Sequence, residues 1–424
     1  MLDIKFIREN KDLVAAGAKK KHIEFNVEEL LTADDARRLL QTNIEKMRAD
    51  QNKASQNVMK VADAERLQLI NEMKKLKEEL AKDEEKLKDV VKSWQTLMLQ
   101  VPNIPDMSVP EGVSDADNKE VKVWGKKPNF NFKPKNHVEL MEELDMVDLK
   151  KGSEVAGFRG YYLKNAAAKL SFAIWQLSFD FFLKRGGFEP MIVPSLVKRS
   201  ALMGTGYLPQ GEEDLYKTQD GDYLAGTAEV ATMSYFADTI LSAEELPKKI
   251  LAFSPCFRRE AGSYGKDTKG IMRVHEFYKL EQVVLCEASH EESVKNHEWV
   301  NRNTEEMMEL LNIPYHTIIN CGGDLGLGQV KKYDIELWIP SESKYREISS
   351  ASYFHDFQTR RLNIKYKDKD GKLRFVHSLN STALPTPRIL IALIENNQQE
   401  DGSVKVPEVL QKFMGTDVIK KLPN

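Results

Sequence analysis

Charged side chains that could bind a polyphosphate are concentrated in residues 257–282, which read FRREAGSYGKDTKGIMRVHEFYKLEQ. The two ends of this stretch have the composition of strands and its middle is rich in glycine, which predicts a hairpin with a long loop. On the first strand, the guanidinium of Arg258 could hold a phosphate or a carboxylate through two hydrogen bonds. Glu260 lies two residues further on and therefore on the same strand face, where it could accept a hydrogen bond from an amine.

The returning strand supplies groups that would complete a nucleotide site. Phe277 offers a flat ring on which a base could stack, and Arg273 places a second cation near a polyphosphate. His275 adjoins this strand and could be offered as a base, although a structural role is the better interpretation. These residue types, in this order, indicate ATP bound over an antiparallel sheet.

A second glycine-rich run, CGGDLGLG at residues 321–328, is a competing candidate for phosphate binding. It has no lysine and no following helix signal, so a tight turn near a pocket is the better interpretation. The sequence also contains neither GxxxxGKS nor GxxxxGKT, and this excludes a P-loop.

The elements around the hairpin predict how these residues are positioned. A largely apolar helix is expected over residues 165–184, because Gly186 and Gly187 follow it as a stop signal. Strands bounded by irregular loops alternate with helices in no strict order, which favours an α+β fold with an antiparallel sheet flanked by helices. The predicted strand runs are 189–193, 249–253, 279–286, 333–338 and 374–378.

The N-terminal part of the chain has a different architecture, because no glycine or proline occurs between Gly17 and Pro102. Such a run indicates helix. Apolar residues recur every three or four positions in two sets that differ in phase, with the break near residues 62–66. The pattern predicts an antiparallel coiled-coil hairpin over residues 27–99. A stutter within one long helix is the alternative.

Length and charge bound the remaining possibilities. With 424 residues, the chain exceeds the roughly 250–300 residues that one core can hold, and prolines at 102, 105 and 110 mark a linker. We therefore expect an N-terminal arm domain over residues 1–104 and a second domain over residues 105–424. The net charge of −3 means that any basic surface must be local.

Three features of the sequence predict a cytoplasmic protein. The three cysteines are widely spaced and form no CxxC pair, which is typical of a reducing compartment. The first residues, MLDIKFIREN, mix acids and bases and are unlike a signal peptide. No segment approaches the roughly 18 consecutive apolar residues of a membrane helix, so no membrane association is expected.

Three separated segments resemble the signature motifs of the class II aminoacyl-tRNA synthetases. GFEPMIVP at 187–194 is similar to motif 1, residues 257–282 are similar to motif 2, and LNSTALPTPRILIALIE at 379–395 is similar to motif 3. Within this class, GTAEV at 226–230, REISSASYFHDFQTRR at 346–361 and the arm resemble the seryl-tRNA synthetases. The resemblance covers nearly the whole chain. It implies a class II catalytic domain preceded by a tRNA-binding coiled-coil arm.

The resemblance also implies a reaction and a set of site residues. The enzyme would activate L-serine with ATP to seryl-adenylate and transfer the serine to tRNA(Ser). Arg258 and Arg388 would be catalytic, with Arg258 on the serine carboxylate and the α-phosphate and Arg388 on the γ-phosphate. The residues expected to bind L-serine are Thr227, Ala228, Glu229, Arg258, Glu281 and Thr382. The residues expected to bind ATP are Arg258, Arg259, Glu260, Val274, Phe277, Glu347, Ile348, Ser349, Ser350 and Arg388.

More specific contacts follow from the same resemblance. Glu229 would face the serine ammonium group, and Glu281 would accept a hydrogen bond from the serine hydroxyl. Glu260 would bind the amine of the adenine ring. Glu347 and Ser350 resemble the ligands of Mg²⁺, a cation that prefers oxygen donors and bridges phosphates.

The implied partners extend beyond the small substrates. The arm would grip the long variable arm of tRNA(Ser), and the loop over residues 262–270, with Lys266 and Lys269, would meet its acceptor end. Motif 1 implies a homodimer. Whether tRNA(Sec) is also charged stays open. Two alternatives remain: a related ligase that charges a carrier protein, whose relatives lack such an arm, and a non-enzymatic coiled-coil scaffold that binds RNA.

The arm and the catalytic domain should be separable. Replacing residues 40–87 with a short turn should leave the catalytic domain folded, because the arm has its own apolar seam. Serine-dependent exchange of pyrophosphate into ATP should survive within about tenfold, since the reacting groups lie outside the arm. Transfer of serine to tRNA should fall by several orders of magnitude. Exchange and charging assays measure the two steps, and equal tRNA charging by the truncated and intact proteins would contradict the role of the arm.

Overall fold

The structure is a computed structural model that describes residues 1–58, 62–263, 265 and 267–421. Its internal contacts divide the chain into two compact units. The first consists of Met1–Lys19 and Ile23–Ile104, and the second of Lys20–His22 and Pro105–Asn424. None of the helices in the described ranges combines the length and the apolar character that crossing a bilayer requires.

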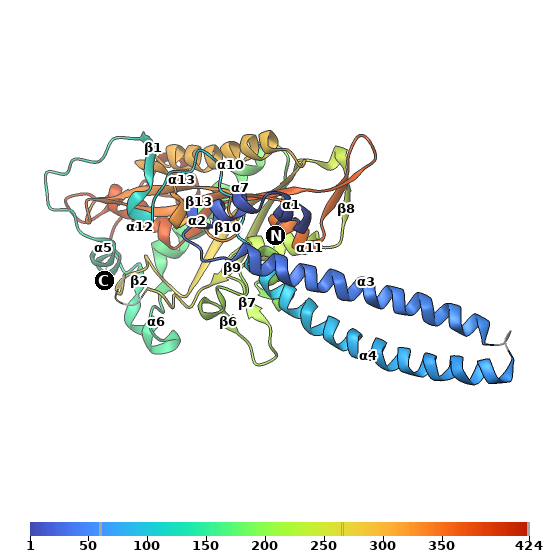
Figure 1. Ribbon diagram of the computed structural model, residues 1–424. Helices are drawn as coiled ribbons and strands as arrows, with labels where there is room; N and C mark the ends of the chain where they lie inside the picture. The colour runs from blue at the N-terminus through green and yellow to red at the C-terminus, as the bar shows by residue number, and fades with distance from the viewer. Residues whose placement is uncertain (59–61, 264, 266, 422–424) are drawn as a thin grey trace. The chain divides into compact units, whose positions relative to one another are not determined.

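The first unit is a pair of long helices on a small helical base (Figure 1). Its helices are α1 (Ile4–Glu9), α2 (Lys11–Lys20, whose last residue belongs to the second unit), α3 (Val27–Asn57) and α4 (Asp63–Gln100). Asn26 caps α3, because its side chain accepts hydrogen bonds from the backbone N–H groups of Glu28 and Glu29. The base is held together by buried apolar side chains, among them Ile7, Val14, Val27, Leu30, Met98 and Val101.

Two contacts between α3 and α4 establish that these helices run antiparallel (Figure 1). Arg48 donates a hydrogen bond to Glu84 at 2.8 Å. Eleven residues earlier on α3, the guanidinium of Arg37 lies 4.6 Å from the centre of the Trp94 ring, ten residues later on α4. Partners therefore move backward along α4 as positions move forward along α3. The predicted helical hairpin is confirmed, and a stutter in one long helix is excluded.

The break between the two arm helices comes slightly earlier than predicted. α3 ends at Asn57, and Ala62 is already the N-cap of α4. The predicted break near residues 62–66 therefore falls on the cap and the first turn of α4. Residues 59–61 lie outside the described part of the chain.

The second unit is built around an eight-stranded sheet (Figure 1). Neighbouring strands are antiparallel except β4 and β9, which are parallel. The strand order is β1 (Lys119–Trp124), β11 (Tyr315–Ile319), β12 (Lys331–Ile339), β13 (Lys344–His355), β16 (His377–Thr386), β10 (Glu276–Cys286), β9 (Lys248–Phe257) and β4 (Phe188–Ile192). The predicted α+β fold around an antiparallel sheet is confirmed.

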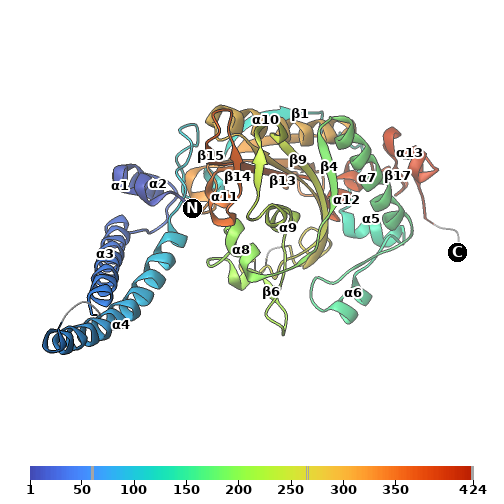
Figure 2. The same ribbon diagram turned by 90° about the vertical axis from the view of Figure 1, so that its right-hand side faces the viewer.

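Helices cover both faces of this sheet (Figure 2). Two adjacent residues of β10, which point to opposite faces, identify a helix on each face. Gln282 donates to the Val300 carbonyl oxygen on α10, whereas Glu281 faces the start of α9. The helices of this unit are α5 (His137–Glu143), α6 (Leu149–Ala156), α7 (Asn165–Lys184), α8 (Arg199–Thr205), α9 (Ala228–Tyr235), α10 (His290–Leu310), α11 (Phe357–Leu362), α12 (Arg388–Asn396) and α13 (Glu408–Met414). The helix predicted over residues 165–184 is α7 and has the same bounds.

Short strands complete the second unit in four small sheets. They are β2 (Val147–Asp148) with β3 (Tyr162–Leu163); β5 (Leu196–Val197), β7 (Tyr223–Leu224) and β6 (Tyr216–Lys217); β15 (Leu373–Phe375), β14 (Lys365–Lys367) and β8 (Ile240–Ser242); and β17 (Val404–Lys405) with β18 (Val418–Ile419). The strand predicted over residues 374–378 is therefore split between β15 and the start of β16.

The hairpin that carries the charged stretch differs from its prediction. Between β9 and β10, the described residues of 258–275 form neither helix nor strand. The last ladder-like bond runs from the Arg258 N–H to the His275 carbonyl oxygen at 2.9 Å. Beyond it, Glu260 has a left-handed φ of +55°, and this turns the chain out of the sheet. The predictions that placed Arg258 and Glu260 on one strand face, and Arg273 on the returning strand, are therefore wrong.

The glycine-rich run at 321–328 surrounds a cation of the protein itself. Lys21 donates from its ammonium group to two backbone carbonyl oxygens of this run and to that of the residue that follows it. The acceptors are Gly326, Leu327 and Gln329, at 3.0, 2.9 and 2.5 Å. A Cβ atom on Gly322 would lie 2.0 Å from the Lys20 carbonyl oxygen, so only glycine fits there. The loop presents carbonyl oxygens to an ammonium group, which supports the tight-turn interpretation over a phosphate cradle.

Candidate active site

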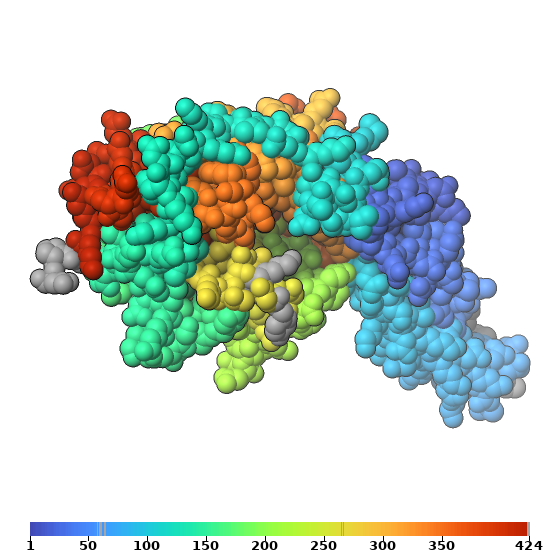
Figure 3. Space-filling view, turned by 90° about the vertical axis from the view of Figure 1, so that its left-hand side faces the viewer, coloured from blue at the N-terminus to red at the C-terminus, as the bar shows by residue number. Residues whose placement is uncertain are grey.

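A small cavity brings together most of the residues predicted to bind substrates. It has a volume of about 110 Å³ and lies between the central strands, the loop 258–275 and the start of α12. The predicted site residues that line it are Arg258, Glu260, Val274, Phe277, Glu347, Ile348, Ser350, Thr382 and Arg388. An open cleft of about 660 Å³ shares Arg258, Glu260, Glu347 and Arg388 with it. In Figure 3 the yellow loop segment faces the viewer below the orange segment of β12 and β13.

Two arginines are oriented in this cavity by backbone carbonyl oxygens. Arg388, the first residue of α12, donates to Met272 O at 3.1 Å and to Glu347 O at 2.9 Å. Arg258 donates from Nε to Gly226 O at 3.3 Å, and its guanidinium lies 5.4 Å from the Phe277 ring centre. Burial and the like charges of Arg258 and Arg273 lower the pKa of Arg388, although Glu347 opposes the shift. The cavity is therefore suited to anions.

Ion pairs fix the loop at the mouth of the cavity. Glu260 Oε2 lies 2.5 Å from Arg273 Nη1, and Arg273 Nε lies 3.5 Å from Asp267. Asp267 also bonds Arg346 of β13 at 2.6 Å. Asp267 therefore links two arginines from different elements and ties the loop to the sheet. Burial alone would raise the pKa of Asp267, but the hydrogen bond and the charge of Arg346, together with Arg273, lower it.

A second group of buried polar residues lies deeper, between β10, β16 and α9. Thr227 is the N-cap of α9 and donates from Oγ1 to Glu281 Oε2 at 3.4 Å. Glu281 and Thr382 face each other across β10 and β16. The Lys279 ammonium lies 2.5 Å from Glu281 Oε2, and both side chains are buried. Lys279 was not predicted, although two opposite charges spaced two residues apart in an apolar strand were a usable signal.

Both oxygens of the Glu229 carboxylate have donors. Tyr207 donates its hydroxyl at 2.8 Å, and the side-chain amide of Gln358 donates at 2.6 Å. Ser378 donates in turn to Gln358 at 2.7 Å and fixes that amide. Burial raises the pKa of Glu229, and the hydrogen bonds from Gln358 and Tyr207 oppose the shift. Tyr207 and Gln358 were not predicted, because only the fold brings them to Glu229.

A β-bulge sets the orientation of the two predicted metal ligands. On a regular strand Glu347 and Ser350, three residues apart, would point to opposite faces. Ile348 is an extra residue opposite β12, since Glu336 pairs with Glu347 and Ile335 with Ser349. This bulge returns Glu347 to the face of Ser350, and both line the small cavity.

The charge state of Glu347 fits a cation ligand. Burial alone would raise the pKa of its carboxyl group, but the charges of Arg388, Lys332 and Arg258 lower it below its ordinary value. The carboxylate is therefore ionised, as Mg²⁺ requires. Within the described ranges, no group of three or more acidic, histidine or cysteine side chains forms a metal site on its own. Glu347 and Ser350 suit a cation that takes its other oxygen ligands from phosphates and water.

β12 adds two charged residues that the sequence analysis did not single out. Lys332 lies 3.2 Å from Asp334. Burial raises the pKa of Asp334 to about 7, with Glu347 adding to the shift and Lys332 opposing it. Asp334 stands opposite Ser350 in the strand register. Charged residues alternate along this strand at Lys332, Asp334 and Glu336, and this pattern could have indicated that they lie near the site.

Some predicted residues do not reach the cavity. Arg259 is exposed, and its guanidinium donates to the Glu213 carbonyl oxygen at 3.2 Å, outside the cavity lining. Ser349 donates to the Thr382 carbonyl oxygen at 2.6 Å and is likewise absent from the lining. His275 Nδ1 lies 2.9 Å from Arg258 O, in agreement with a structural role. Lys266 lies outside the described residues.

A larger cavity of about 700 Å³ lies beside α7, away from this chemistry. Aromatic and aliphatic side chains dominate its lining, and Phe158 and Phe172 at its rim are mostly exposed. Arg258, Glu347 and Arg388 are not part of it. The two predicted catalytic arginines therefore line the small cavity and not this larger one.

An antiparallel sheet that delivers a charged hairpin loop and a helix-start arginine to one anion-binding cavity defines a class II aminoacyl-tRNA synthetase. Residues 216–397 match the family model of the tRNA synthetase class II core domain (G, H, P, S and T). Residues 1–105 match that of the seryl-tRNA synthetase N-terminal domain. The chain belongs to the seryl-tRNA synthetase family.

Relatives of known name cover the whole chain. The serine–tRNA ligase of Deinococcus radiodurans is 43% identical over 416 residues, which are 98% of each chain. That of Thermodesulfovibrio yellowstonii is 42% identical over 427 residues, 99% of this chain and 100% of the relative. The seryl-tRNA synthetase of Pyrococcus horikoshii, solved in complex with ATP, is 37% identical with a TM-score of 0.91 over 100% of both chains. The predicted family, class II fold and enzyme class are confirmed.

Removing only one partner of the buried pair of Lys279 and Glu281 should destabilise the protein strongly. Lys279→Met would leave the Glu281 carboxylate buried without its partner, which costs about 3–5 kcal/mol and lowers the thermal midpoint of unfolding. Adding Glu281→Gln removes that charge and should restore part of the loss. A double-mutant cycle by thermal denaturation measures the coupling. A Lys279→Met protein as stable as the unmodified chain would contradict this account.

Proposed function

We propose that the chain activates L-serine with ATP at the small cavity together with the open cleft that shares Arg258 and Arg388 with it, and then transfers the serine to tRNA(Ser). The observation that carries this assignment is the position of Arg258, which lines the cavity that contains Arg388 and also donates to the carbonyl oxygen of Gly226, the residue before Thr227. A cation at that point can hold the carboxylate of one substrate and the α-phosphate of the other. The relative from Pyrococcus horikoshii was solved with ATP, which supports a nucleotide site in this fold.

The buried carboxylates suit the two polar ends of serine. In the proposed pose, Glu229 accepts from the serine ammonium group, and Thr227 and Ala228 line the pocket beside it. Glu281 and Thr382 bind the serine hydroxyl. Support comes from their mutual contacts, since Thr227 bonds Glu281 and Glu281 faces Thr382.

ATP is proposed to lie over the sheet with its base on Phe277. The pairing of Arg258 with the Phe277 ring supports a stacked arrangement at this point. Glu260 would bind the adenine amine and Val274 would add a backbone contact, and Ile348 would line the site. Since Glu260 is paired with Arg273, binding of the adenine amine would have to share or replace that ion pair. The proposed set omits Arg259 and Ser349, whose contacts lie elsewhere.

Mg²⁺ is proposed as the cofactor, with Glu347 and Ser350 as its protein ligands. When bound with ATP, this cation neutralises charge on the phosphates. The ionised Glu347 carboxylate and the shared orientation produced by the bulge in β13 support the assignment.

The chemistry needs no covalent enzyme intermediate. The serine carboxylate attacks the α-phosphorus of ATP in line, and the bond to the β-phosphate oxygen breaks to release pyrophosphate. A hydroxyl of the terminal adenosine of tRNA then attacks the serine carbonyl carbon and AMP leaves. Arg258 and Arg388 orient the reactants and stabilise the charge that develops on the phosphates.

The arm and the loop 262–270 are proposed to bind tRNA(Ser), and charging of tRNA(Sec) is left open. The match of residues 1–105 to the seryl-tRNA synthetase N-terminal domain supports the arm as the tRNA grip. Lys269, which is exposed, supports phosphate contacts by the loop. The proposed functional domains are the tRNA-binding arm domain over residues 1–104 and the catalytic domain over residues 105–424.

A homodimer through motif 1 is also proposed. β4 is an edge strand of the large sheet, so one side of it can accept a partner. Ile192 on β4 and Phe172 on α7 are 84% and 77% exposed, which is costly for large apolar side chains on a monomer.

A cytoplasmic location is proposed as well. All three cysteines are buried free thiols, which supports a reducing compartment.

Loss of either arginine should abolish serine activation. Arg258→Ala and Arg388→Ala should each lower serine-dependent pyrophosphate exchange at least ~100-fold, because each removes charge stabilisation formed in the transition state. The matched control is Arg374→Ala, which removes an exposed arginine paired with Asp368 and should leave exchange unchanged. A folded Arg388→Ala protein with near-normal exchange would overturn the assignment.

The serine pocket should reject alanine strongly. Alanine lacks the hydroxyl that Glu281 and Thr382 are proposed to bind, so its binding would leave buried polar groups without partners. A site of this kind discriminates by about 10³-fold or more in kcat/KM. Pyrophosphate exchange with each amino acid in turn measures this ratio. Alanine within tenfold of serine would contradict the pocket assignment.

A further inference from the structure

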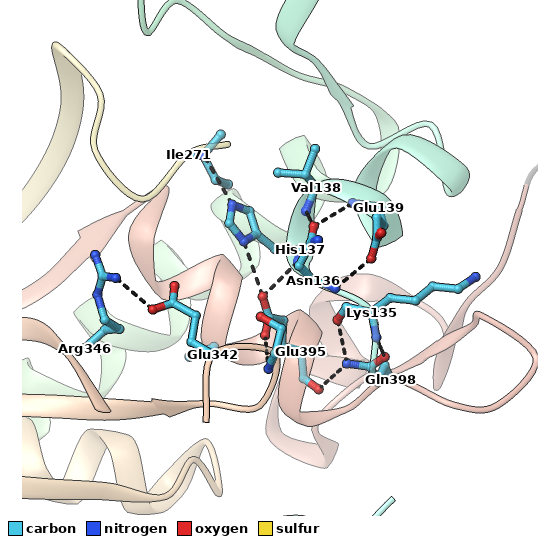
Figure 4. A network of polar contacts seen from close by, with 12 residues as sticks. Lys135, Asn136, His137, Val138, Glu139, Ile271, Glu342, Arg346, Glu395 and Gln398 are labelled. Atoms are coloured by element: carbon cyan, nitrogen blue, oxygen red, sulfur yellow. Dashed lines mark hydrogen bonds and ion pairs between the residues drawn. The ribbon is translucent and has the colours of Figure 1, made fainter. Parts of the chain in front are cut away.

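A buried carboxylate on α12 accepts hydrogen bonds from two backbone N–H groups. Glu395 is fully buried and lies seven residues after Arg388, which places the two on the same side of the helix. Its Oε1 accepts from the His137 backbone N–H at 2.8 Å, and its Oε2 accepts from the Ser341 N–H at 3.1 Å. Figure 4 shows the contact between His137 and Glu395.

The imidazole of His137 extends this contact to the loop 258–275. Its Nε2 accepts from the Ile271 backbone N–H at 3.3 Å, and its Nδ1 lies 3.3 Å from Glu395 Oε1 (Figure 4). Because Nε2 is an acceptor, the ring proton of the neutral imidazole is on Nδ1, where it can be donated to Glu395. A Cβ atom on Gly270 would lie 2.2 Å from Nε2, so the glycine is what lets the loop approach the ring.

The next residue of the loop contacts Arg388. Met272 O accepts from Arg388 Nε at 3.1 Å. Helix α12 therefore holds two successive residues of the loop. It holds Ile271 through Glu395 and His137, and it holds Met272 through Arg388 itself.

We propose that His137 is a positioning residue for Arg388, and so for ATP. By fixing the Ile271 N–H, the imidazole sets where the adjoining Met272 carbonyl oxygen stands, and that oxygen orients the guanidinium. The inference rests on the proposed role of Arg388 as the ATP clamp. It predicts that His137 acts on the affinity for ATP and leaves the serine pocket alone, since Glu229, Glu281 and Thr382 have no contact with this chain of bonds.

A second branch from Glu395 reaches the same loop. Ser341, which donates to Glu395, precedes Glu342, and Glu342 bonds Arg346 at 2.8 Å. Arg346 bonds Asp267 of the loop at 2.6 Å. Glu395 thus supports the loop at two points, and His137 is the shorter route, with one side chain between the carboxylate and the loop backbone.

Substitution of His137 by glutamine or by asparagine tests separately the roles of its two ring nitrogens. The amide of glutamine extends to about the position of Nε2 and can accept from Ile271 N–H, whereas that of asparagine ends near Nδ1. In the full chain, His137→Asn and His137→Ala should raise the KM for ATP by ~10-fold or more, as expected for a stranded buried N–H. His137→Gln should stay within ~3-fold, and the KM for serine should change less than ~2-fold in all three.

A matched control separates positioning from the loss of a buried imidazole. His297 is fully buried, and its Nε2 bonds a single carbonyl oxygen, Ala351 O, at 2.9 Å. His297→Gln should lower the thermal midpoint without separating the two KM values. Both KM values come from pyrophosphate exchange with one substrate varied at a time.

The possible results distinguish failure of the proposed function from failure of the positioning role of His137. If the unmodified chain shows no serine-dependent exchange, the proposed function fails. If it exchanges normally but the His137 variants raise both KM values together, or change stability alone, the positioning role is overturned. If His137→Ala does not fold, equal KM values for ATP in His137→Gln and His137→Asn overturn it.

Discussion

The orientation of the Arg388 guanidinium is the constraint on which the catalytic unit depends. Two carbonyl oxygens orient it, one from Met272 in the loop 258–275 and one from Glu347 in β13. Carbonyl oxygens satisfy its donors without cancelling its charge, which leaves that charge available to a phosphate. Because the loop, the strand and the helix lie far apart in the sequence, all three must be in place before the guanidinium is. The anion site is therefore a property of the whole sheet and not of one motif.

Two β-bulges determine which face of the sheet several predicted site residues occupy. The extra residue Ile348 on β13 turns Glu347 to the side of Ser350, and an extra residue on β16, Ala383, brings Thr382 opposite Glu281. Without them, strand alternation would direct half of these oxygen-bearing side chains into the opposite layer of the protein. Each bulge thus changes the face to which the following side chains point, while the hydrogen-bonded ladder continues on either side of it.

Features that depend on local pattern were predictable, and features that depend on register were not. The helix over 165–184 follows from an apolar run with a glycine stop, and the arm follows from the missing glycine and proline. The residues of the site came from motif resemblance. Most of them line the small cavity, whereas Thr227, Glu229 and Glu281 belong to the deeper polar group, and Arg259 and Ser349 make their contacts elsewhere. The left-handed turn at Glu260 was missed because its ion pair with Arg273 forms only in three dimensions. Lys279 was missed because its burial is set by neighbouring strands that no local window contains.

The three backbone carbonyl oxygens that bind Lys21 limit how the catalytic unit can be separated from the rest of the chain. The N-terminal family match ends at residue 105, beside the linker, yet Lys20–His22 belongs to the catalytic unit. A gene fragment that starts at the linker would encode a catalytic half whose three carbonyl oxygens have lost their ammonium donor. In such a fragment, water would have to replace the ammonium group at these oxygens. A fragment intended to reproduce the catalytic unit therefore needs the short segment around Lys21 as well as the chain after the linker.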